Sequence, residues 1–342
     1  MEKTDARGKE KGKTGLDISP VERLHTLLSV DMDATDKLIH ARMGSAVPMI
    51  PDLSRHLIDS GGKRLRPMLT LAAAKLGSYR GDAHICLAAA VEFIHTATLL
   101  HDDVVDASTL RRGKVAANLV WGNKPSILVG DFLFSRAFQL MVETGSLTVL
   151  DILAGAAAII AEGEVMQLKS TNNLAATEEY YLQVVKAKTA ALFSAAAEAG
   201  AVVSGQGAAL ERAMKCYGDN LGIAFQLVDD SLDYSGRQAL MGKSVGDDFH
   251  EAKVTLPVIL AYARADDQAR RFWQRSIEAG QQSESDLDRA ITLVEETGAI
   301  RETMARARHY ADEAQKALAD LPASDIRSAL SDIADFCVER AY

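Results

Sequence analysis

The sequence predicts an all-α fold, and three observations lead to this prediction. Nearly every segment longer than ten residues has apolar residues at helical spacing, with Ala, Leu, Glu, Gln and Lys between them. No segment shows the convincing apolar and polar alternation of a β-strand. The seven prolines fall mostly where a helix is expected to begin or end.

The expected helices follow one another between glycine-containing breaks. These breaks are GGKR at 61–64, LGSYRG at 76–81, RRGK at 111–114, WGNKPS at 121–126 and YSGRQ at 234–238. Segments 84–106 and 207–234 are apolar on more than one face, so we expect them at the centre of a helical bundle. Segment 266–342 carries more charge and is expected at the periphery. We expect a disordered tail over 1–15 and a single domain over 16–342.

Composition favours a cytoplasmic, soluble enzyme. Of 342 residues, 48% are hydrophobic and 25% charged, which is ordinary for a globular protein. The net charge of −9 disfavours a general nucleic-acid binder, whose surface would be basic. Three cysteines far apart, without a CxxC pair, indicate a reducing compartment and no zinc site. No apolar run is long and uninterrupted enough for a membrane span, and the N-terminus does not resemble a signal peptide.

A first acidic cluster occurs in LLHDDVVDASTLRRG, at the end of an apolar segment. On a helix, the carboxylates of Asp102 and Asp106 lie one turn apart on the same face, with Asp103 beside them. Like charges at this spacing destabilise a helix by roughly 0.2–0.5 kcal/mol. Negative charge near a helix C-terminus is also unfavourable. A cationic partner is therefore expected.

A second acidic cluster with the same spacing occurs in AFQLVDDSLDYSG, as Asp229, Asp230 and Asp233. A single DDxxD is as often a solvated charged turn, but two at the ends of apolar helices predict a shared site. If the helices face each other, six carboxylates line one cavity, which requires divalent cations. Carboxylate oxygens suit Mg²⁺, which shares its remaining positions with phosphates, so we expect about two to three ions.

Two basic patches complete the predicted electrostatics. Arginine binds phosphate oxygens in pairs, and lysine acts as a point charge. Alone, each patch is more often solvated surface, but beside a metal site they predict a clamp for a second, metal-free diphosphate. His95 lies two helical turns before Asp102; a lone histidine is more often structural, but its neighbours favour ligand contact. The patches contain Lys63, Arg64 and Arg66 in GGKRLRP, and Arg111, Arg112 and Lys114 in TLRRGK.

Eight sequence blocks, in order, resemble the trans-isoprenyl diphosphate synthases, or polyprenyl synthetase family. The resemblance extends from about residue 20 to the C-terminus. It implies an isoprenoid-synthase-type helical bundle around a central cavity. The blocks are GGKRLRP, HTATLLHDDVVD, RRGK, GDFLFSRAF, EGEVMQL, KAKTAALF, FQLVDDSLD and MGKSVGDD followed by KVTLP.

The resemblance also implies residue roles. It assigns Mg²⁺ binding, and with it catalysis, to Asp102, Asp103, Asp106, Asp229, Asp230 and Asp233. It assigns isopentenyl diphosphate to Lys63, Arg66, His95 and Arg112. It assigns the allylic diphosphate to Arg111, Lys188, Thr189, Gln226, Lys243 and Lys253, of which Arg111 and Lys188 are also expected to be catalytic. One departure concerns Lys253, because Ala252 stands where the family usually has glycine.

The implied reaction is ionisation, condensation and elimination. Metal ions and cationic side chains stabilise the departing diphosphate, and the allylic cation adds to the double bond of isopentenyl diphosphate. The sequence shows no strong general base, and the resemblance implies that the released diphosphate takes the proton. A dry apolar pocket must protect the cation from water.

Product length is expected to depend on Ala97 and Thr98, the fifth and fourth residues before Asp102. Short-chain members of the family commonly carry an aromatic ring there, which blocks the growing chain. Two small residues predict an octaprenyl to decaprenyl product, decaprenyl being favoured, as in members that make ubiquinone side chains. Two alternatives stay open: Ala97 is only a close helix-packing residue, or the product is hexaprenyl or shorter.

Two rival functions are also considered. A cyclase or head-to-head synthase shares DDxxD but does not need the isopentenyl diphosphate clamp. A non-catalytic helical subunit typically loses one aspartate cluster, and this sequence keeps both. Family resemblance further implies a homodimer packed through central helices, a farnesyl or geranylgeranyl diphosphate primer, and a product that passes to membrane enzymes.

Overall fold

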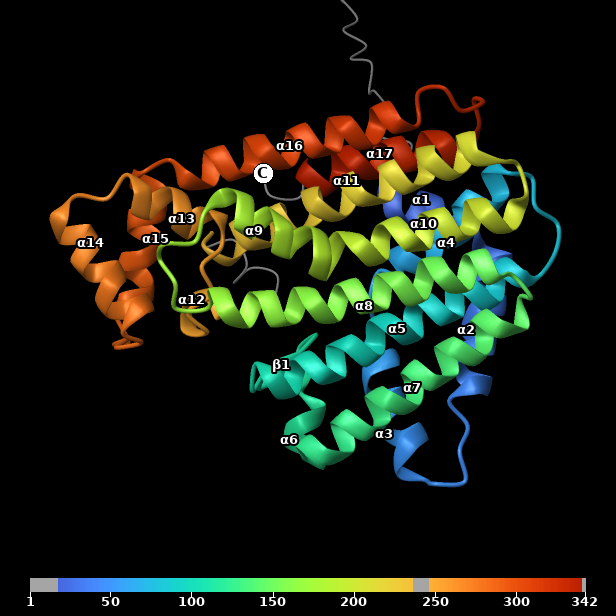
Figure 1. Cartoon of the computed structure of the whole chain (residues 1–342), viewed down its shortest axis with the longest axis horizontal. Helices are drawn as coiled ribbons and strands as arrows, with labels where there is room; N and C mark the ends of the chain where they lie inside the picture. The colour runs from blue at the N-terminus through green and yellow to red at the C-terminus, as the bar shows by residue number, and fades with distance from the viewer. Residues whose placement is uncertain (1–17, 236–245, 340–342) are drawn as a thin grey trace, which may run out of the picture.

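Two long helices, α5 (Ala83–Val105) and α11 (Ala208–Asp233), lie at the centre of a helical bundle. The structure is a computed structural model that describes residues 18–235 and 246–339. Figure 1 shows α5, α8, α10 and α11 running along the long axis of the molecule. Both central helices match the segments expected from the sequence. The predicted tail over 1–15 and Lys243 lie outside the described residues.

The remaining elements follow in chain order. The N-terminal helices are α1 (Pro20–Leu27), α2 (Ser29–Arg42), α3 (Met49–Ile58) and α4 (Leu65–Leu76). After α5 come β1 (Leu110–Arg111), β2 (Lys114–Val115), α6 (Ala117–Trp121), α7 (Asn123–Glu143), α8 (Leu147–Ser170), α9 (Glu178–Val185), the π-helical turn η1 (Lys186–Ala190) and α10 (Ala191–Ser204). After α11 come α12 (Asp247–His250), α13 (Leu256–Ala263), α14 (Asp267–Trp273), the π-helical turn η3 (Gln274–Glu278), α15 (Asp286–Glu296), α16 (Ala299–Ala317) and α17 (Asp325–Glu339).

Helix α5 is apolar because it packs against neighbours on several sides. It contacts α4, α7 and α10, and its buried residues include Leu87, Phe93 and Leu100. Within the described part of the chain it is the one helix long and apolar enough to cross a membrane. Because 67% of its apolar window is buried inside the protein, we assign it as a core helix.

The consecutive helices α9, η1 and α10, here called the η1 rod, pack very closely against α8 and α11. A Cβ atom at Gly163 on α8 would lie 2.8 Å from the backbone nitrogen of Lys188, and one at Gly222 on α11 would lie 2.6 Å from the Cα of Ala190. Only glycine permits such approach. Glycine on both neighbours therefore holds η1 between α8 and α11. A π-helical turn inside a helix is a frequent feature of functional sites.

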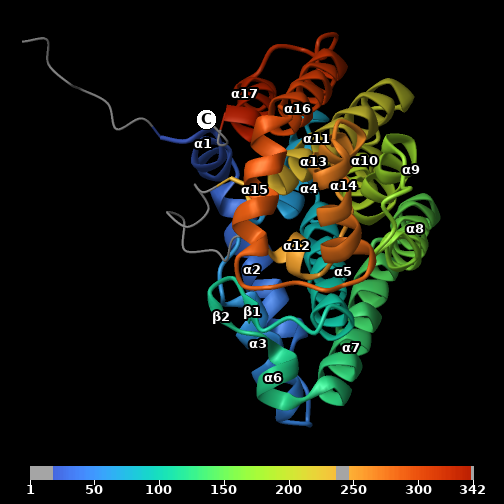
Figure 2. The ribbon, with the colours of Figure 1, turned by 90° about the vertical axis from the view of Figure 1, so that its left-hand side faces the viewer.

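Helices α14 to α17 form an outer layer, as expected for the charged C-terminal segment (Figures 1 and 2). The inner face of this layer is nevertheless well packed. Trp273, Ala307 and Leu330 are fully buried, and α16 packs along α11. The outer layer thus covers one side of the helix that carries the second aspartate cluster.

The all-α prediction is confirmed, and one short hairpin is the only strand structure among the described residues. Leu110 pairs with Val115 and Arg111 with Lys114 in an antiparallel two-residue ladder. The turn between the strands has positive φ at Arg112 (53°) and Gly113 (75°), as a tight hairpin turn requires. Two residues per strand are too few to produce an alternating sequence pattern. The hairpin follows α5 directly and carries the second basic patch.

Ala252 has a left-handed backbone, with φ of 52°. This explains why glycine would suit the position, because a left-handed conformation costs a residue with a Cβ about 1–2 kcal/mol. We predict that Ala252→Gly raises the free energy of unfolding by about 0.5–1 kcal/mol, measured by urea denaturation. In a matched control, Ala305→Gly at an exposed position within α16 should lower it by about 1 kcal/mol. A destabilised Ala252→Gly variant would contradict the assignment of strain.

Candidate active site

The two aspartate clusters lie at the C-terminal ends of α5 and α11. Asp102 is in the last turn of α5, and Asp106 is the residue at which this helix ends. On α5, His95, Thr98 and Asp102 are only partly buried, while Ala97 between them is fully buried. This spacing of three and four residues places the partly buried side chains on one stripe, which leads to Asp102.

Asp103 lies on a different side of α5 and is fully buried. Arg111 of β1 donates to its Oδ1 from Nε at 2.8 Å, with the second guanidinium nitrogen at 2.5 Å. Asn118 donates to its backbone carbonyl at 2.9 Å. The structure therefore shows Asp103 holding the hairpin arginine in place. Its predicted role as a metal ligand stays a prediction.

Two lysines from distant segments contact the other carboxylates of the first cluster. Lys188 of η1 lies 4.0 Å from Asp102 and donates to Glu164 of α8 at 2.8 Å. Lys253, which precedes α13, donates to Asp106 at 3.0 Å. Three of the cationic residues expected to bind the allylic diphosphate, Arg111 included, are therefore each beside an aspartate of the first cluster.

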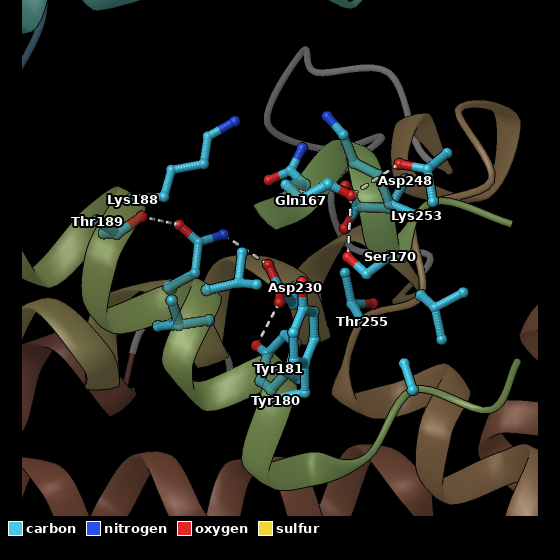
Figure 3. Close-up of a pocket in the computed structure, with 16 residues that line it drawn as sticks. Gln167, Ser170, Tyr180, Tyr181, Lys188, Thr189, Asp230, Asp248, Lys253 and Thr255 are labelled. Atoms are coloured by element: carbon cyan, nitrogen blue, oxygen red, sulfur yellow. Dashed lines mark hydrogen bonds between the residues drawn. The ribbon is translucent and has the colours of Figure 1, made fainter. Parts of the chain in front are cut away.

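The second cluster is held by a chain of hydrogen bonds (Figure 3). Thr189 donates to Gln226 at 2.8 Å, and Gln226 donates to Asp230 Oδ1 at 2.6 Å. Tyr181 of α9 donates to the other oxygen, Oδ2, at 2.5 Å. Asp230 is thus fixed from both sides by residues of the η1 rod and of α11 itself.

Asp233 binds the backbone at the start of α12. Its Oδ1 accepts from the backbone nitrogens of Gly246 at 3.2 Å and Asp247 at 3.3 Å, and its Oδ2 accepts from Asp248 at 3.0 Å. The negative charge of Asp248 in turn lies near Asp230, Asp233 and Lys253. Because Lys253 also binds Asp106, this segment connects the two clusters.

The clusters have more negative charge than their surroundings stabilise. Burial, followed by mutual repulsion, raises the pKa of Asp102 to about 7, although Lys188 opposes the shift. Burial likewise raises the pKa of Asp230 to about 7 and that of Asp233 to about 6. Such shifts mark groups whose charged form needs a cation, and they are concentrated at functional sites.

The donor atoms suit Mg²⁺. Among the described residues, the buried oxygens Asp103 Oδ2 and Glu164 Oε1 have no hydrogen-bond partner. Free carboxylate oxygens of this kind are the ligands that Mg²⁺ prefers. Within residues 18–235 and 246–339 no three acidic, histidine or cysteine side chains yet lie close enough to hold a metal. Lysines and arginine instead contact several of the carboxylates, and a metal ion would share or replace these contacts.

The predicted clamp for the second diphosphate gathers around Arg66. Its guanidinium lies 3.2 Å from His95 and stacks 4.3 Å from the centre of the Phe193 ring. Burial lowers the pKa of Arg66 to about 10, so it stays charged, and burial beside the arginines lowers the pKa of His95 well below its usual value. Arg66 Nε has no hydrogen-bond partner among the described residues.

The other two clamp residues lie at the edge of this cluster. Arg112 donates to the backbone carbonyls of Gly61 and Leu57. The ammonium of Lys63 lies 5.6 Å from the Phe336 ring of α17. The structure thus joins Arg66 with His95, whereas Lys63 has a contact on the C-terminal layer.

A cavity of about 130 Å³ lies beside the second cluster. Its lining includes residues that the sequence predicted for the site and residues that it did not. Lys188, Thr189, Gln226, Asp230 and Lys253 line it, all of them predicted site residues. Sequence reasoning missed several of the residues around them. The sequence blocks EGEVMQL and MGKSVGDD contain Glu164, Gln167 and Asp248, to which no role was assigned, and Tyr181 had no motif signal. The missed residues are Glu164, Gln167, Tyr181 and Asp248.

Tyr181→Phe is expected to weaken metal use. Loss of the hydroxyl leaves Asp230 without its buried donor, and removing such an outer partner of a metal ligand typically costs about 10–100-fold in affinity or activity. We predict that the Mg²⁺ concentration for half-maximal activity rises about tenfold. Tyr180→Phe is the matched control, because the Tyr180 hydroxyl instead donates to the Met166 carbonyl at 3.0 Å. Equal responses of both variants would contradict the role of Tyr181.

Comparison with known proteins shows the family of the chain. The family model described as polyprenyl synthetase matches residues 47–294. Octaprenyl diphosphate synthase of Escherichia coli is 42% identical over 320 residues, which cover 94% of this chain and 99% of that protein.

Two solved structures are also similar. A polyprenyl synthase of Caulobacter crescentus, complexed with calcium and isoprenyl diphosphate, is 53% identical with a TM-score of 0.92, covering 96% of this chain and all of that one. A decaprenyl diphosphate synthase of Rhodobacter capsulatus is 55% identical with a TM-score of 0.91, covering 94% of this chain and all of that one. The chain therefore belongs to the polyprenyl synthetase family and is a prenyltransferase, a long-chain polyprenyl diphosphate synthase.

Proposed function

We propose that this enzyme makes decaprenyl diphosphate by adding isopentenyl diphosphate repeatedly to a farnesyl or geranylgeranyl diphosphate primer. The observation that carries this proposal is the partly buried stripe of α5, on which the small side chain of Thr98 lies one turn before Asp102, with Ala97 fully buried beside it. Similarity to the R. capsulatus decaprenyl diphosphate synthase, at 55% identity, supports the same length. A quinone side chain, as in ubiquinone, is the proposed use.

The allylic diphosphate is proposed to bind at the aspartate clusters. Asp102 and Asp106, with Asp229 and Asp230, would hold about two to three Mg²⁺ ions. When bound, Mg²⁺ supplies positive charge for the departing diphosphate. Asp103 and Asp233 are proposed as ligands with them, and they also hold Arg111 and the backbone at the start of α12. Calcium and isoprenyl diphosphate in the C. crescentus structure support this pairing of ions and ligand.

Cationic residues then act directly on the allylic diphosphate. Arg111, Lys188 and Lys253 donate to its oxygens, which stabilises charge as the carbon–oxygen bond breaks. Thr189 and Gln226, which are hydrogen-bonded in a chain to Asp230, line the same cavity as Lys188 and Lys253. The released diphosphate is the proposed acceptor of the proton.

Isopentenyl diphosphate is proposed to bind at Arg66, His95, Arg112 and Lys63. The unpartnered Nε of Arg66 is a donor suited to phosphate oxygen. Neutral His95 can share one proton with the diphosphate without adding charge beside the arginines. The two diphosphates are therefore proposed to be bound by different positive charges. Metal ions would bind the allylic diphosphate, and arginines would bind isopentenyl diphosphate.

Mass spectrometry of the products tests this proposal. Purified enzyme receives farnesyl diphosphate, isopentenyl diphosphate and Mg²⁺, and we expect decaprenyl diphosphate as the main product. An octaprenyl or shorter main product would overturn the length. Consumption of the allylic diphosphate alone would instead indicate a cyclase, and no turnover with any common primer would indicate a non-catalytic subunit.

A homodimer is proposed through α7 and α8, which lie on the same side of the molecule (Figure 2). Large apolar side chains are exposed along this side, among them Leu128 (66%), Val142 (63%) and Ile159 (45%). Monomeric proteins rarely expose such contiguous apolar surface. A second copy of the chain would cover it.

Leu128→Glu combined with Ile159→Glu is predicted to give monomers. Two buried carboxylates without partners would strongly oppose association. The measurement is molar mass by light scattering, for which we expect half the wild-type value. Val30→Glu is the matched control, because Val30 on α2 is 79% exposed but lies on a different element. A double variant that keeps the wild-type mass would place the interface elsewhere.

The enzyme is proposed to work in the cytoplasm and to pass its product to membrane enzymes. Helix α5, which alone among the described residues is long and apolar enough to cross a membrane, is used in the core. The product, in contrast, is an amphiphile with a long hydrocarbon chain. Fractionation of cells after brief labelling would detect the enzyme in the soluble fraction and the product in the membrane fraction.

A further inference from the structure

Glu92 of α5 is a buried acidic residue that the proposed mechanism does not use. Its side chain is 3% exposed and lies beside the arginine cluster that is proposed to bind isopentenyl diphosphate. Arg64 Nη1 donates to Glu92 Oε1, and Arg64 Nη2 donates to the backbone carbonyl of Ile58 at 3.2 Å. A buried carboxylate with such a partner is strongly constrained, because breaking the pair would leave an uncompensated charge.

Arg64 ends the loop that joins α3 to α4, and this loop has an unusual backbone. Gly61 and Gly62 have φ of 88° and 146°, and Arg64 itself has φ of 48°. A residue with a Cβ keeps a left-handed conformation only where its surroundings enforce it. The ion pair with Glu92, the bond to Ile58 and a weaker contact of Nε with Asp36 at 3.8 Å are the contacts that enforce it here.

The same loop carries or contacts the residues that are proposed to bind the diphosphate. Lys63 directly precedes Arg64, and Arg66 follows two residues later in the first turn of α4. Arg112 of the hairpin donates to the Gly61 carbonyl, and a Cβ at Gly62 would lie 3.0 Å from the Arg112 guanidinium. The positions of these three side chains therefore depend on the path of this loop.

We propose that the ion pair between Arg64 and Glu92 is a positioning element for the metal-free diphosphate site. It fixes the loop at 59–64 so that Lys63, Arg66 and Arg112 converge on one diphosphate. Neither Arg64 nor Glu92 needs to touch the ligand. This inference rests on the proposed function, because it concerns the site assigned there to isopentenyl diphosphate.

A purely electrostatic role for Glu92 predicts the opposite result. If its carboxylate only reduced the positive potential, Glu92→Gln would make the site more positive and bind diphosphate more tightly. If it positions the loop, Glu92→Gln binds diphosphate more weakly although the net charge is more favourable. The sign of the change therefore separates the two roles.

The test uses Glu92→Gln, Arg64→Gln and the double variant in the full-length enzyme. We expect each to raise the KM for isopentenyl diphosphate by roughly tenfold or more, the effect of losing one charge-assisted hydrogen bond. The KM for the allylic diphosphate and kcat should change less than about twofold, because this pair does not contact the aspartate clusters. The double variant should be no worse than either single variant, since both remove the same pair.

Two further arms keep the test decisive. Calorimetry with inorganic diphosphate and EDTA measures the metal-free site without catalysis, and its Kd should rise in parallel with the KM. If a single variant fails to fold, the double variant decides, because it removes both charges of the pair together. The matched control is Arg275→Gln combined with Asp286→Asn, which removes a two-bond pair of 2.8 Å contacts in η3 and α15 and should leave both constants unchanged.

The outcomes separate this inference from the proposed function. Unchanged or lower KM and Kd in the double variant would overturn the positioning role. A wild-type enzyme that binds diphosphate without metal but never consumes isopentenyl diphosphate would overturn the proposed function, while the calorimetric comparison would still test the ion pair.

Discussion

Asp102→Asn is expected to lower the rate of isopentenyl diphosphate incorporation by roughly 10³-fold. The change keeps the size of the side chain but removes the charge that is proposed to hold metal beside the leaving diphosphate. Loss of one well-placed electrostatic contact typically costs about 10²–10³ in kcat, and loss of a metal ligand belongs to the upper end. Initial rates with saturating primer, isopentenyl diphosphate and Mg²⁺ measure the effect.

Asp151→Asn provides the matched control for this experiment. Asp151 is an exposed aspartate on α8, so its amide variant should retain the wild-type rate. Asp102→Asn should also remain folded, because burial already raises the pKa of Asp102 to about 7 and the neutral form is tolerated there. An Asp102→Asn enzyme with undiminished activity would contradict the metal assignment, although not the enzyme class.

Phenylalanine at Thr98 or Ala97 is expected to shorten the product by several isoprene units. Thr98 is partly buried on the same stripe as Asp102, one turn away, so a ring there would stand in the path of a chain growing from the aspartates. Ala97 is fully buried beside this stripe, and a larger side chain would push into it. Chromatography of labelled products, or their mass spectra, would show the change.

A graded series at Ala97 serves as the control. Substitution by Val, Leu and Phe should shorten the product in that order if the side chain limits the cavity. Because overpacking a core costs about 1–3 kcal/mol, thermal unfolding must be followed in parallel. Full-length product from a folded Thr98→Phe enzyme would show that α5 does not limit chain growth, and would favour simple helix packing at Ala97.

Much of this architecture could be predicted because its signals are local. The apolar periodicity of α5 and α11 extends over many turns, and each DDxxD lies within one turn of a helix. Contacts between distant segments gave no such signal. Tyr181 lies 49 residues from Asp230, and neither residue predicts the other. Pairing of Arg64 with Glu92, 28 residues apart, is equally invisible in sequence.

The sequence could not distinguish the roles of the individual aspartates within the two clusters. Spacing treats the two clusters alike, but Asp103 binds the hairpin arginine and Asp233 binds the start of α12. These differences arise from what each helix faces, and the hairpin itself was too short to recognise. Ala252 is another such case, since the departure from glycine at this position was read only as a doubt about Lys253, and the left-handed backbone became visible in the structure.

The close contacts of η1 with Gly163 and Gly222 indicate which parts of this fold can change in sequence and which cannot. The backbone of the turn that carries Lys188 and Thr189 touches two other helices directly, so no choice of side chain can adjust those distances. Thr98 and Ala97 of α5, in contrast, differ from larger residues only in their side chains. If α5 limits chain growth as proposed, single substitutions there would change the product size while the machinery that breaks the diphosphate bond is inherited unchanged, and a protein engineer has the same freedom.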